Sequence, residues 1–136
     1  MSLSDESRIN IIKHLIMKAH KTEEDVKLLL ESNSFVSATN RIYYGIFYII
    51  SALAVKNKYS TSKHSQLIGW FNKNFVRYSK VEPKIGRIIH NAFDQRQEAD
   101  YNPLSNFQYD DLLEDFKNMQ EVIRVVEKLI NEEKST

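Results

Sequence analysis

The segment from Ser37 to Val55 is apolar on nearly every side over the length of a helix. A helix that is hydrophobic all round is normally buried, so we expect Ala38 to Ala54 to lie at the centre of the fold. The few polar and small residues of the segment recur at intervals of three and four: Arg41, Tyr44, Gly45, Tyr48 and Ser51. Residues at these intervals form one ridge along a helix.

Gly45 is the unusual member of this ridge, because glycine costs a helix roughly 1 kcal/mol relative to alanine. Its presence predicts that a ligand or another backbone comes close, and the alternative is a tight crossing with a neighbouring helix. Arginine and aromatic residues are favoured in interface cores, and glycine permits close approach. Arg41, Tyr44, Gly45 and Tyr48, with the end of the fourth helix, are therefore candidates for a homodimer interface.

Composition restricts the fold class. The 136 residues suit one domain, 1–136, with a core of its own. Three glycines and two prolines are too few for the turns of a many-stranded sandwich or barrel, which leaves an all-α fold. The absence of cysteine excludes disulfides and thiolate metal sites, and the net charge of +1 gives no indication of a nucleic-acid partner.

The N-terminal residues lack the basic and apolar regions of a signal peptide. No apolar run reaches the roughly 18 uncharged residues that a membrane span requires. We therefore expect a cytoplasmic protein that does not enter a membrane.

Apolar spacing and helix-start signals divide the chain into helices. The first is predicted from a cap at Ser4 towards Ser32, with a candidate kink or second start at Lys21–Asp25, where Thr22 would be the cap. The central helix is predicted to end near Lys56, after a start at Asn33–Ser34.

The second half of the chain predicts three further helices. One spans about Lys63 to Tyr78, and the next begins at Glu82–Pro83 and is broken after Tyr101. A capping box between Ser105 and Gln108 opens the last helix, which runs to about Ile130. The whole pattern predicts an up-and-down bundle of four to five helices.

Common catalytic signatures are absent from the sequence. There is no glycine-rich phosphate loop and no His-Glu-x-x-His, and the four histidines are too scattered for a metal constellation. We predict no metal and no cofactor. The residues that remain as candidates lie on three predicted helices: Arg41 and Tyr44, His64, and Arg96 with Asp100 and Tyr101.

Arg96 falls on the inward face of the fourth helix, where a charge requires a partner. Asp100 is four residues further on and can reach it along the same face. Arg96 is therefore either a buried ion-pair residue or a contact for phosphate. His64 begins a core-facing stripe and is either a helix cap or a catalytic base.

Three segments carry a resemblance to a known family: Asn40–Phe47, with its Arg-x-Tyr-Tyr pattern; Lys63–Ser65; and Arg96–Tyr101, with Arg-x-x-x-Asp-Tyr. In this order they resemble the HEPN domain family of prokaryotic helical bundles, over about residues 18–130. The resemblance implies an HEPN-like bundle, commonly a homodimer, often encoded beside a small, minimal nucleotidyltransferase.

Many members of that family are metal-independent ribonucleases that serve as toxins, with the nucleotidyltransferase as antitoxin. The resemblance implies that their arginine holds a phosphate, while a histidine four to six residues later takes a proton from the 2′-hydroxyl. Arg96 matches the arginine, but Tyr101 stands at the place of a histidine and no histidine follows. Tyrosine has a pKa of about 10 and is a poor base at neutral pH.

We therefore expect an HEPN-like module that acts with a small nucleotidyltransferase in toxin–antitoxin function or in binding RNA or a nucleotide. The alternative is a metal-independent endoribonuclease toxin that uses Arg96 and His64 as a surrogate base. We predict that His64 and Arg96 lie too far apart within one molecule to contact the same phosphate.

Overall fold

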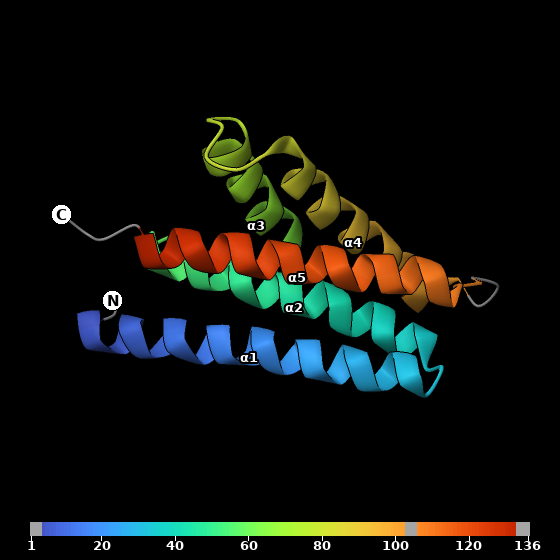
Figure 1. Cartoon of the computed structure of the whole chain (residues 1–136). Coiled ribbons are helices and arrows are strands. Elements are labelled where there is room, and N and C mark those ends of the chain that lie inside the picture. The colour runs from blue at the N-terminus through green and yellow to red at the C-terminus, as the bar shows by residue number, and fades with distance from the viewer. Residues whose placement is uncertain (1–3, 103–105, 133–136) are drawn as a thin grey trace.

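The computed structural model describes residues 4–102 and 106–132. Within these ranges the chain forms helices and no strand, which confirms the all-α prediction (Figure 1). The elements are α1 (Asp5–Glu31), α2 (Phe35–Lys56), α3 (His64–Phe71), the π-helix η1 (Asn72–Val76), α4 (Pro83–Tyr101) and α5 (Tyr109–Glu132). No helix in the described ranges combines the length and apolarity needed to cross a membrane.

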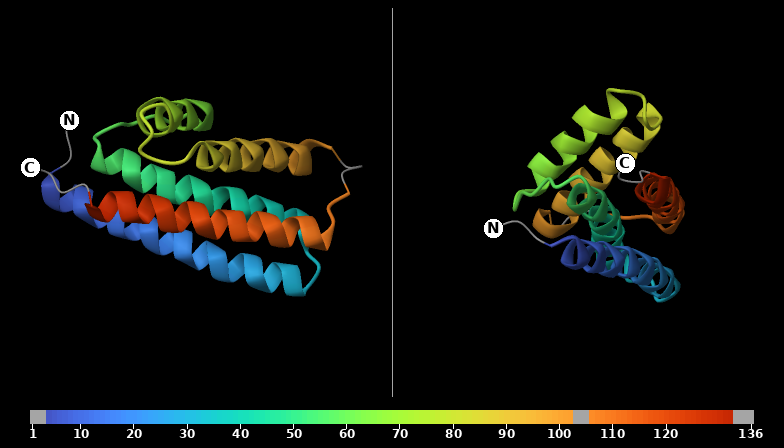
Figure 2. Two further views of the ribbon diagram at one scale, coloured as in Figure 1. Left: turned by 45° about the horizontal axis from the view of Figure 1, so that its top comes forward. Right: turned by 90° about the vertical axis from the view of Figure 1, so that its left-hand side faces the viewer.

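Helix α2 lies at the centre of the bundle, as its sequence predicts. It packs against α1, α5, α4 and α3, and the end-on view in Figure 2 shows it surrounded by them. The long helices α1, α2 and α5 lie side by side, and α3 and α4 cover the remaining side of α2 (Figure 1). Core residues of α2 are fully enclosed along its length, including Ala38, Ile49 and Leu53.

Two predicted helix starts follow the expected local chemistry. The amide of Ser7 donates to Ser4 Oγ at 3.1 Å, so Ser4 caps α1. Pro83 is the first residue of α4, where its missing amide is no loss. Helix α5 begins at Tyr109, directly after the predicted capping box, but Ser105 of that box lies outside the described residues.

One sequence prediction about helix continuity is wrong, and one predicted helix changes its type along its length. Helix α1 runs without a break past Thr22, whose buried hydroxyl donates to the Lys18 carbonyl at 2.7 Å instead of capping a second helix. The third predicted helix changes to a π-helix after Phe71. Here the Asn74 side-chain amide donates to the Trp70 carbonyl and competes with the backbone amides for it.

Gly45 lies at a tight contact of α2 with α1 and α5. It is buried, and a Cβ atom there would overlap Met119 Cε and lie 3.3 Å from Thr22 Cγ2. The tight-crossing alternative is therefore correct, and Gly45 cannot belong to an interface with a second molecule. The other members of the predicted ridge are half-buried at the surface, and we call them the α2 ridge: Arg41, Tyr44, Tyr48 and Ser51.

Candidate functional site

Arg96 extends from α4 onto two adjacent tyrosines of α2. Its Nη2 donates to Tyr44 Oη at 3.3 Å. The guanidinium carbon lies 5.4 Å from the ring centre of Tyr43 and 5.5 Å from that of Tyr44, within cation–π range. Asp100 Oδ2 lies 3.3 Å from Nε, so the predicted ion pair of Arg96 and Asp100 is present.

The guanidinium of Arg96 keeps donor capacity after these contacts. Arginine carries five N–H donors in a planar fork. The short contact with Asp100 is not aligned for hydrogen bonding, and the buried Nε has no acceptor among the described residues. With 22% of its side chain exposed, Arg96 can reach an anion at the surface without leaving its tyrosines.

His64 reaches α2 from the first turn of α3. Its Nδ1 lies 2.7 Å from Tyr43 Oη, and its ring centre lies 4.2 Å from that of Phe47. The residue before it, Lys63, occupies the cap position, and no side chain caps this helix. The helix-cap alternative for His64 is therefore wrong, because its imidazole is engaged with the aromatic side chains of α2.

The protonation states at this contact follow from burial and charge. Burial lowers the pKa of His64, and the positive Arg96 lowers it further, so the imidazole is neutral at pH 7. Burial raises the pKa of Tyr43 far above its usual range, so the phenol keeps its proton.

These states assign the proton of the imidazole. The Tyr43 side chain is only 1% exposed, so its hydroxyl requires an acceptor within the protein. His64 Nδ1 is that acceptor at 2.7 Å, which leaves the proton of the neutral ring on Nε2. His64 therefore presents an N–H donor in the state that the structure favours.

Arg96 and His64 belong to one group of side chains. The ring centre of His64 lies 5.7 Å from that of Tyr43 and 6.2 Å from that of Tyr44, and Arg96 contacts the same two rings. Adjacent residues of α2 face both α3 and α4, which brings both residues onto the same tyrosine pair; that they lie too far apart to contact one phosphate stays a prediction. We call this group the Arg96–His64 cluster, and it consists of Tyr43, Tyr44, Phe47, His64 and Arg96.

Two cations line the α2 ridge beside the cluster. The guanidinium carbon of Arg41 lies 5.2 Å from the ring centre of Tyr44, and Lys18 Nζ lies 4.6 Å from that of Tyr48. Positive charge beside aromatic side chains is a combination found on surfaces that bind single-stranded nucleic acid. Tyr101 is separate from this set: it ends α4 with 78% of its surface exposed.

Sequence reasoning missed Tyr43 and Phe47 as members of the site. Tyr43 lies within the apolar segment that the sequence predicts to be at the centre of the fold, and the structure buries it. The available signal was its hydroxyl, since a phenol inside an apolar stripe needs a polar partner from another helix. Phe47 carried no comparable signal, because only the position of His64 makes it part of the site.

Other titratable groups lie outside the cluster. His20 contacts Glu23 Oε1 at 2.7 Å and Glu127 Oε1 at 2.6 Å, which links α1 to α5 at a half-exposed position. Asp115 borders a small polar cavity between α2, α4 and α5. Within the ranges that the structure describes, no group of three or more histidine and acidic side chains is placed to hold a metal ion.

A sequence model of the HEPN domain matches residues 12–135. The chain belongs to the HEPN domain family. This confirms the resemblance drawn from the three short motifs, and the match includes every residue of the Arg96–His64 cluster.

Relatives with assigned names fall into two groups. A "UPF0332 protein" of Thermotoga maritima is 35% identical over 122 residues, which is 90% of this chain and 92% of that protein. Two Methanocaldococcus jannaschii proteins named "Putative toxin" are each 33% identical, over 67% and 66% of this chain and 62% and 67% of their own lengths.

Proposed function

We propose that this HEPN protein is the toxin-like member of a toxin–antitoxin pair and binds RNA through the Arg96–His64 cluster. The observation that carries the proposal is the meeting of Arg96 and His64 on one tyrosine pair. The similarity to two proteins with toxin in their names supports the biological role. A small nucleotidyltransferase is the partner that we propose for it, and the cytoplasm is the compartment.

The chemistry of the cluster suits a phosphodiester. Arg96 supplies a permanent positive charge from a side chain that is 22% exposed, and neutral His64 supplies an N–H donor from Nε2. Tyr44 and Phe47 provide aromatic surface for an unstacked base. Charge-assisted hydrogen bonds are worth about 1.5–3 kcal/mol each, so loss of Arg96 should weaken RNA binding roughly 10- to 100-fold.

Metal-independent RNA cleavage is the second candidate, and the low pKa of His64 favours it. A neutral imidazole beside an arginine can accept the 2′-hydroxyl proton while the arginine stabilises the developing charge. This route needs a free Nε2 lone pair, so Tyr43 would have to accept from Nδ1 instead of donating to it. Binding without cleavage requires no such change, and we place it first.

Homodimer formation is a further part of the proposal. The α2 ridge and the exposed end of α4 at Tyr101 together offer arginine and tyrosine side chains, the types enriched in interface cores. A homodimer would bring two Arg96–His64 clusters into one particle. Light scattering of the purified protein at micromolar concentration tests this, and a monomeric mass contradicts it.

RNA binding is best tested in EDTA with a short single-stranded RNA. We expect Arg96→Gln and His64→Ala to weaken binding, whereas Arg87→Gln, an exposed arginine on the same helix, should not. Equal affinities in all four proteins would refute the cluster as the binding site. Cleavage of the RNA under these conditions, lost in His64→Ala, would establish the second candidate instead.

The biological role is tested separately by inducing the gene in bacteria. Growth should stop on induction, and co-expression of a neighbouring small nucleotidyltransferase gene should restore it. Unchanged growth at high expression would remove the toxin role but leave RNA binding as a separate result. Arg96→Gln should relieve the arrest if the cluster is responsible for it.

A further inference from the structure

A cleft of about 430 Å³ lies beside the Arg96–His64 cluster, between the start of α1, the second half of α2 and the loop that follows it. Its lining combines cationic, hydroxyl and aromatic side chains: Arg8, Phe47, Ser51, Lys58, Tyr59 and Thr61. No acidic side chain is among the described residues that line it. A concave site with an apolar wall and a few convergent polar groups is typical of small-ligand sites.

The cleft and the cluster share one aromatic ring. Phe47 lines the cleft and stacks on His64 with 4.2 Å between ring centres. Ser51, one turn further along α2, belongs to both the α2 ridge and the cleft. The cluster and the cleft are therefore neighbours along α2.

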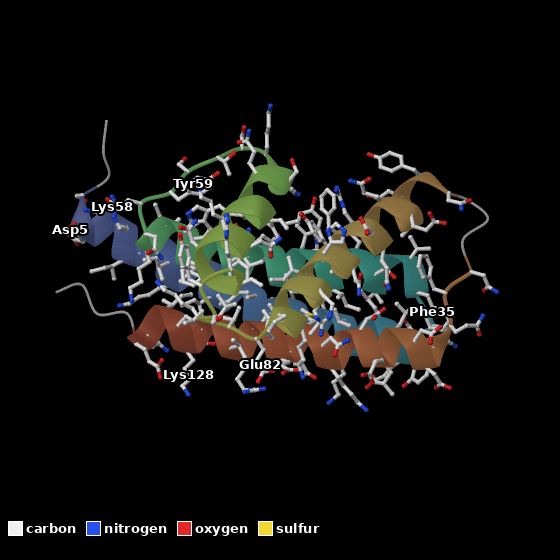
Figure 3. The ribbon with its side chains drawn as sticks, turned by 90° about the horizontal axis from the view of Figure 1, so that it is seen from above. Asp5, Phe35, Lys58, Tyr59, Glu82 and Lys128 are labelled. Carbon is white, nitrogen blue, oxygen red and sulfur yellow. The ribbon has the colours of Figure 1, made fainter. Side chains whose placement is uncertain are left out.

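Two cations from different elements converge on the cleft. Arg8 Nη1 donates to the Val55 carbonyl at 3.1 Å, which anchors this α1 side chain at the end of α2. Lys58 follows α2 and has a φ of 60°, in the left-handed backbone region. Among the described non-glycine residues, only Asn33 and Ser79 also have a positive φ. Figure 3 shows Lys58 and Tyr59 beside the start of α1 at Asp5.

The negative end of the α2 dipole does not exclude an anion here. The carbonyls of its last turn are already occupied: Leu53 accepts from the Asn57 side chain at 2.8 Å, and Ala54 accepts from the Tyr59 amide at 2.9 Å. Val55 accepts from Arg8 as well as from the Lys58 amide. These donors offset the partial charge of the helix end, and the two cations determine the local potential.

We propose that this cleft binds the nucleotide next to the one whose phosphate lies at Arg96 and His64. The ligand class is single-stranded RNA, so the inference rests on the proposed function. Arg8 and Lys58 hold the neighbouring phosphate, and the aromatic wall of Phe47 and Tyr59 contacts the base. Parallel stacking of Tyr59 on Trp70, with 5.0 Å between ring centres, holds that wall in place.

Trp70 gives the experiment an internal reporter, because it is the one tryptophan of the sequence. A ligand against Tyr59 should change the fluorescence of the stacked indole. The titrants are a short 2′-O-methyl RNA, which lacks the 2′-hydroxyl needed for self-cleavage, and adenosine monophosphate. The RNA tests the strand, and the mononucleotide tests whether a free nucleotide fills the same cleft.

Three variants separate the cleft from the cluster. Lys58→Gly removes the cation and suits the left-handed backbone, and Asn33→Gly is its matched control because Asn33 has φ of 58° in another loop. Arg8→Gln removes the charge but keeps an amide donor for the Val55 carbonyl. We expect Lys58→Gly and Arg8→Gln each to weaken RNA binding about 3- to 10-fold, less than Arg96→Gln, since each removes one phosphate contact that solvent and salt screen.

Asn33→Gly should bind as the unmodified protein does, and Arg96→Gln should weaken RNA binding yet retain the Trp70 change at saturation. Full affinity in Lys58→Gly and Arg8→Gln, with Arg96→Gln still impaired, would overturn the cleft and leave the proposed function intact. RNA binding by none of the proteins would overturn both. Saturable binding of the mononucleotide alone would overturn RNA as the occupant.

Discussion

Two neighbouring residues of α2, Tyr44 and Gly45, face regions of opposite character. Gly45 faces α1 and α5, where a buried methionine and a buried threonine close on its backbone. Tyr44 faces α4 and accepts a hydrogen bond from Arg96 of that helix. A second arginine, Arg41 of α2, lies over its ring. The first region is closed by packing alone, and the second keeps polar donors at its surface.

The contrast shows that one side of α2 contributes to stability and the other holds polar groups in place. Close packing leaves no volume for a new atom, so the Gly45 side determines stability. The Tyr44 side holds charged and hydrogen-bonding groups in fixed positions, and it tolerates partial exposure because its cation is supported by aromatic rings. We therefore expect substitutions on the Gly45 side to change the free energy of unfolding, and those on the Tyr44 side to change binding and protonation.

The largest effect should come from Gly45→Val. The new side chain would collide with Met119 and crowd Thr22, both of which are almost fully buried. Overpacking of this kind destabilises by about 1–3 kcal/mol, and we expect the upper end because valine adds two methyl groups beyond the Cβ between two enclosed side chains. Chemical denaturation monitored by circular dichroism measures the loss.

Gly69→Ala is the matched control for that substitution. Nothing lies within 4 Å of a Cβ atom at Gly69, which is exposed on α3. Alanine should stabilise the protein by up to about 1 kcal/mol through its better helix propensity. Equal effects of the two substitutions, in either direction, would contradict the contrast between the two sides of α2.

Sequence periodicity predicted the packed side well. The apolar run in α2, the seam of α5 and the starts at Ser4 and Pro83 depend on local patterns of spacing and capping, and the structure contains them all. Sequence periodicity failed at Thr22 and did not reveal the π-helix at Asn74; in both places a side chain bonds a nearby carbonyl, and the outcome depends on competition between donors.

The site was only half predictable for a different reason. Arg96 and Asp100 belong to one helix turn, so their spacing revealed the pair. The contact of His64 with Tyr43 joins residues 21 positions apart and depends on how the loop after α2 returns the chain. No spacing rule predicts which residues such a loop brings together. The proton assignment on His64 depends on that contact, so it could not be predicted from the sequence.

A second prediction concerns Asp115, whose carboxyl borders a polar cavity on the α4 side of the bundle. Burial raises its pKa from 3.8 to about 6, and the charge of Asp111 adds to the rise. A raised acid pKa means that this carboxyl does not oppose folding below pH 3.8. Its ionisation costs stability as pH rises from 3.8 through 6. Asp115→Asn should therefore stabilise the protein at pH 8 by on the order of 1 kcal/mol.

That gain should be almost gone near pH 3.5, where the carboxyl is protonated in the folded state and mostly protonated in the unfolded state. Denaturation curves of the two proteins at pH 3.5 and 8 provide the comparison. Asp110→Asn, an exposed aspartate at the start of the same helix, is the control and should show no such pH-dependent gain. A gain for Asp115→Asn that is the same at both pH values would argue against ionisation as its cause.

A third prediction removes the buried hydroxyl of the cluster. Tyr43→Phe should cost about 1 kcal/mol, because one hydrogen bond is lost. Nitrogen NMR of the unmodified protein should show the imidazole proton on Nε2 and a hydrogen-bonded Nδ1 acceptor, and Tyr43→Phe should remove the hydrogen-bond shift of Nδ1. Tyr101→Phe at the exposed end of α4 should change neither stability nor this signal. A proton on Nδ1 in the unmodified protein would contradict the assignment.

The last and smallest expected effect is on the pKa of His64. Burial lowers it from 6.5, and the charge of Arg96 lowers it further. Arg96→Gln removes the second cause and keeps a donor for Tyr44, so the pKa should rise towards 6.5 but stay below it because burial remains. Arg87→Gln, an exposed neighbour on α4, should leave it unchanged. Proton NMR titration of the imidazole measures both.

Bulk stability would be the wrong measure of that change, because a second histidine works against it. A lowered pKa makes His64 favour the fold above pH 6.5 and disfavour it as pH falls through the folded pKa. His20 has the opposite sign: burial lowers its pKa, but hydrogen bonds and charges of Glu127 and Glu23 raise it overall. The contribution of His20 to the free energy of unfolding is complete below pH 6.5 and is lost as pH rises through its folded pKa. The two windows meet near pH 6.5 with opposite slopes, so only a signal resolved for the His64 ring can decide whether Arg96 acts on it. An imidazole pKa that is identical in Arg96→Gln and the unmodified protein would separate the two residues electrostatically and remove the basis for treating them as one phosphate site.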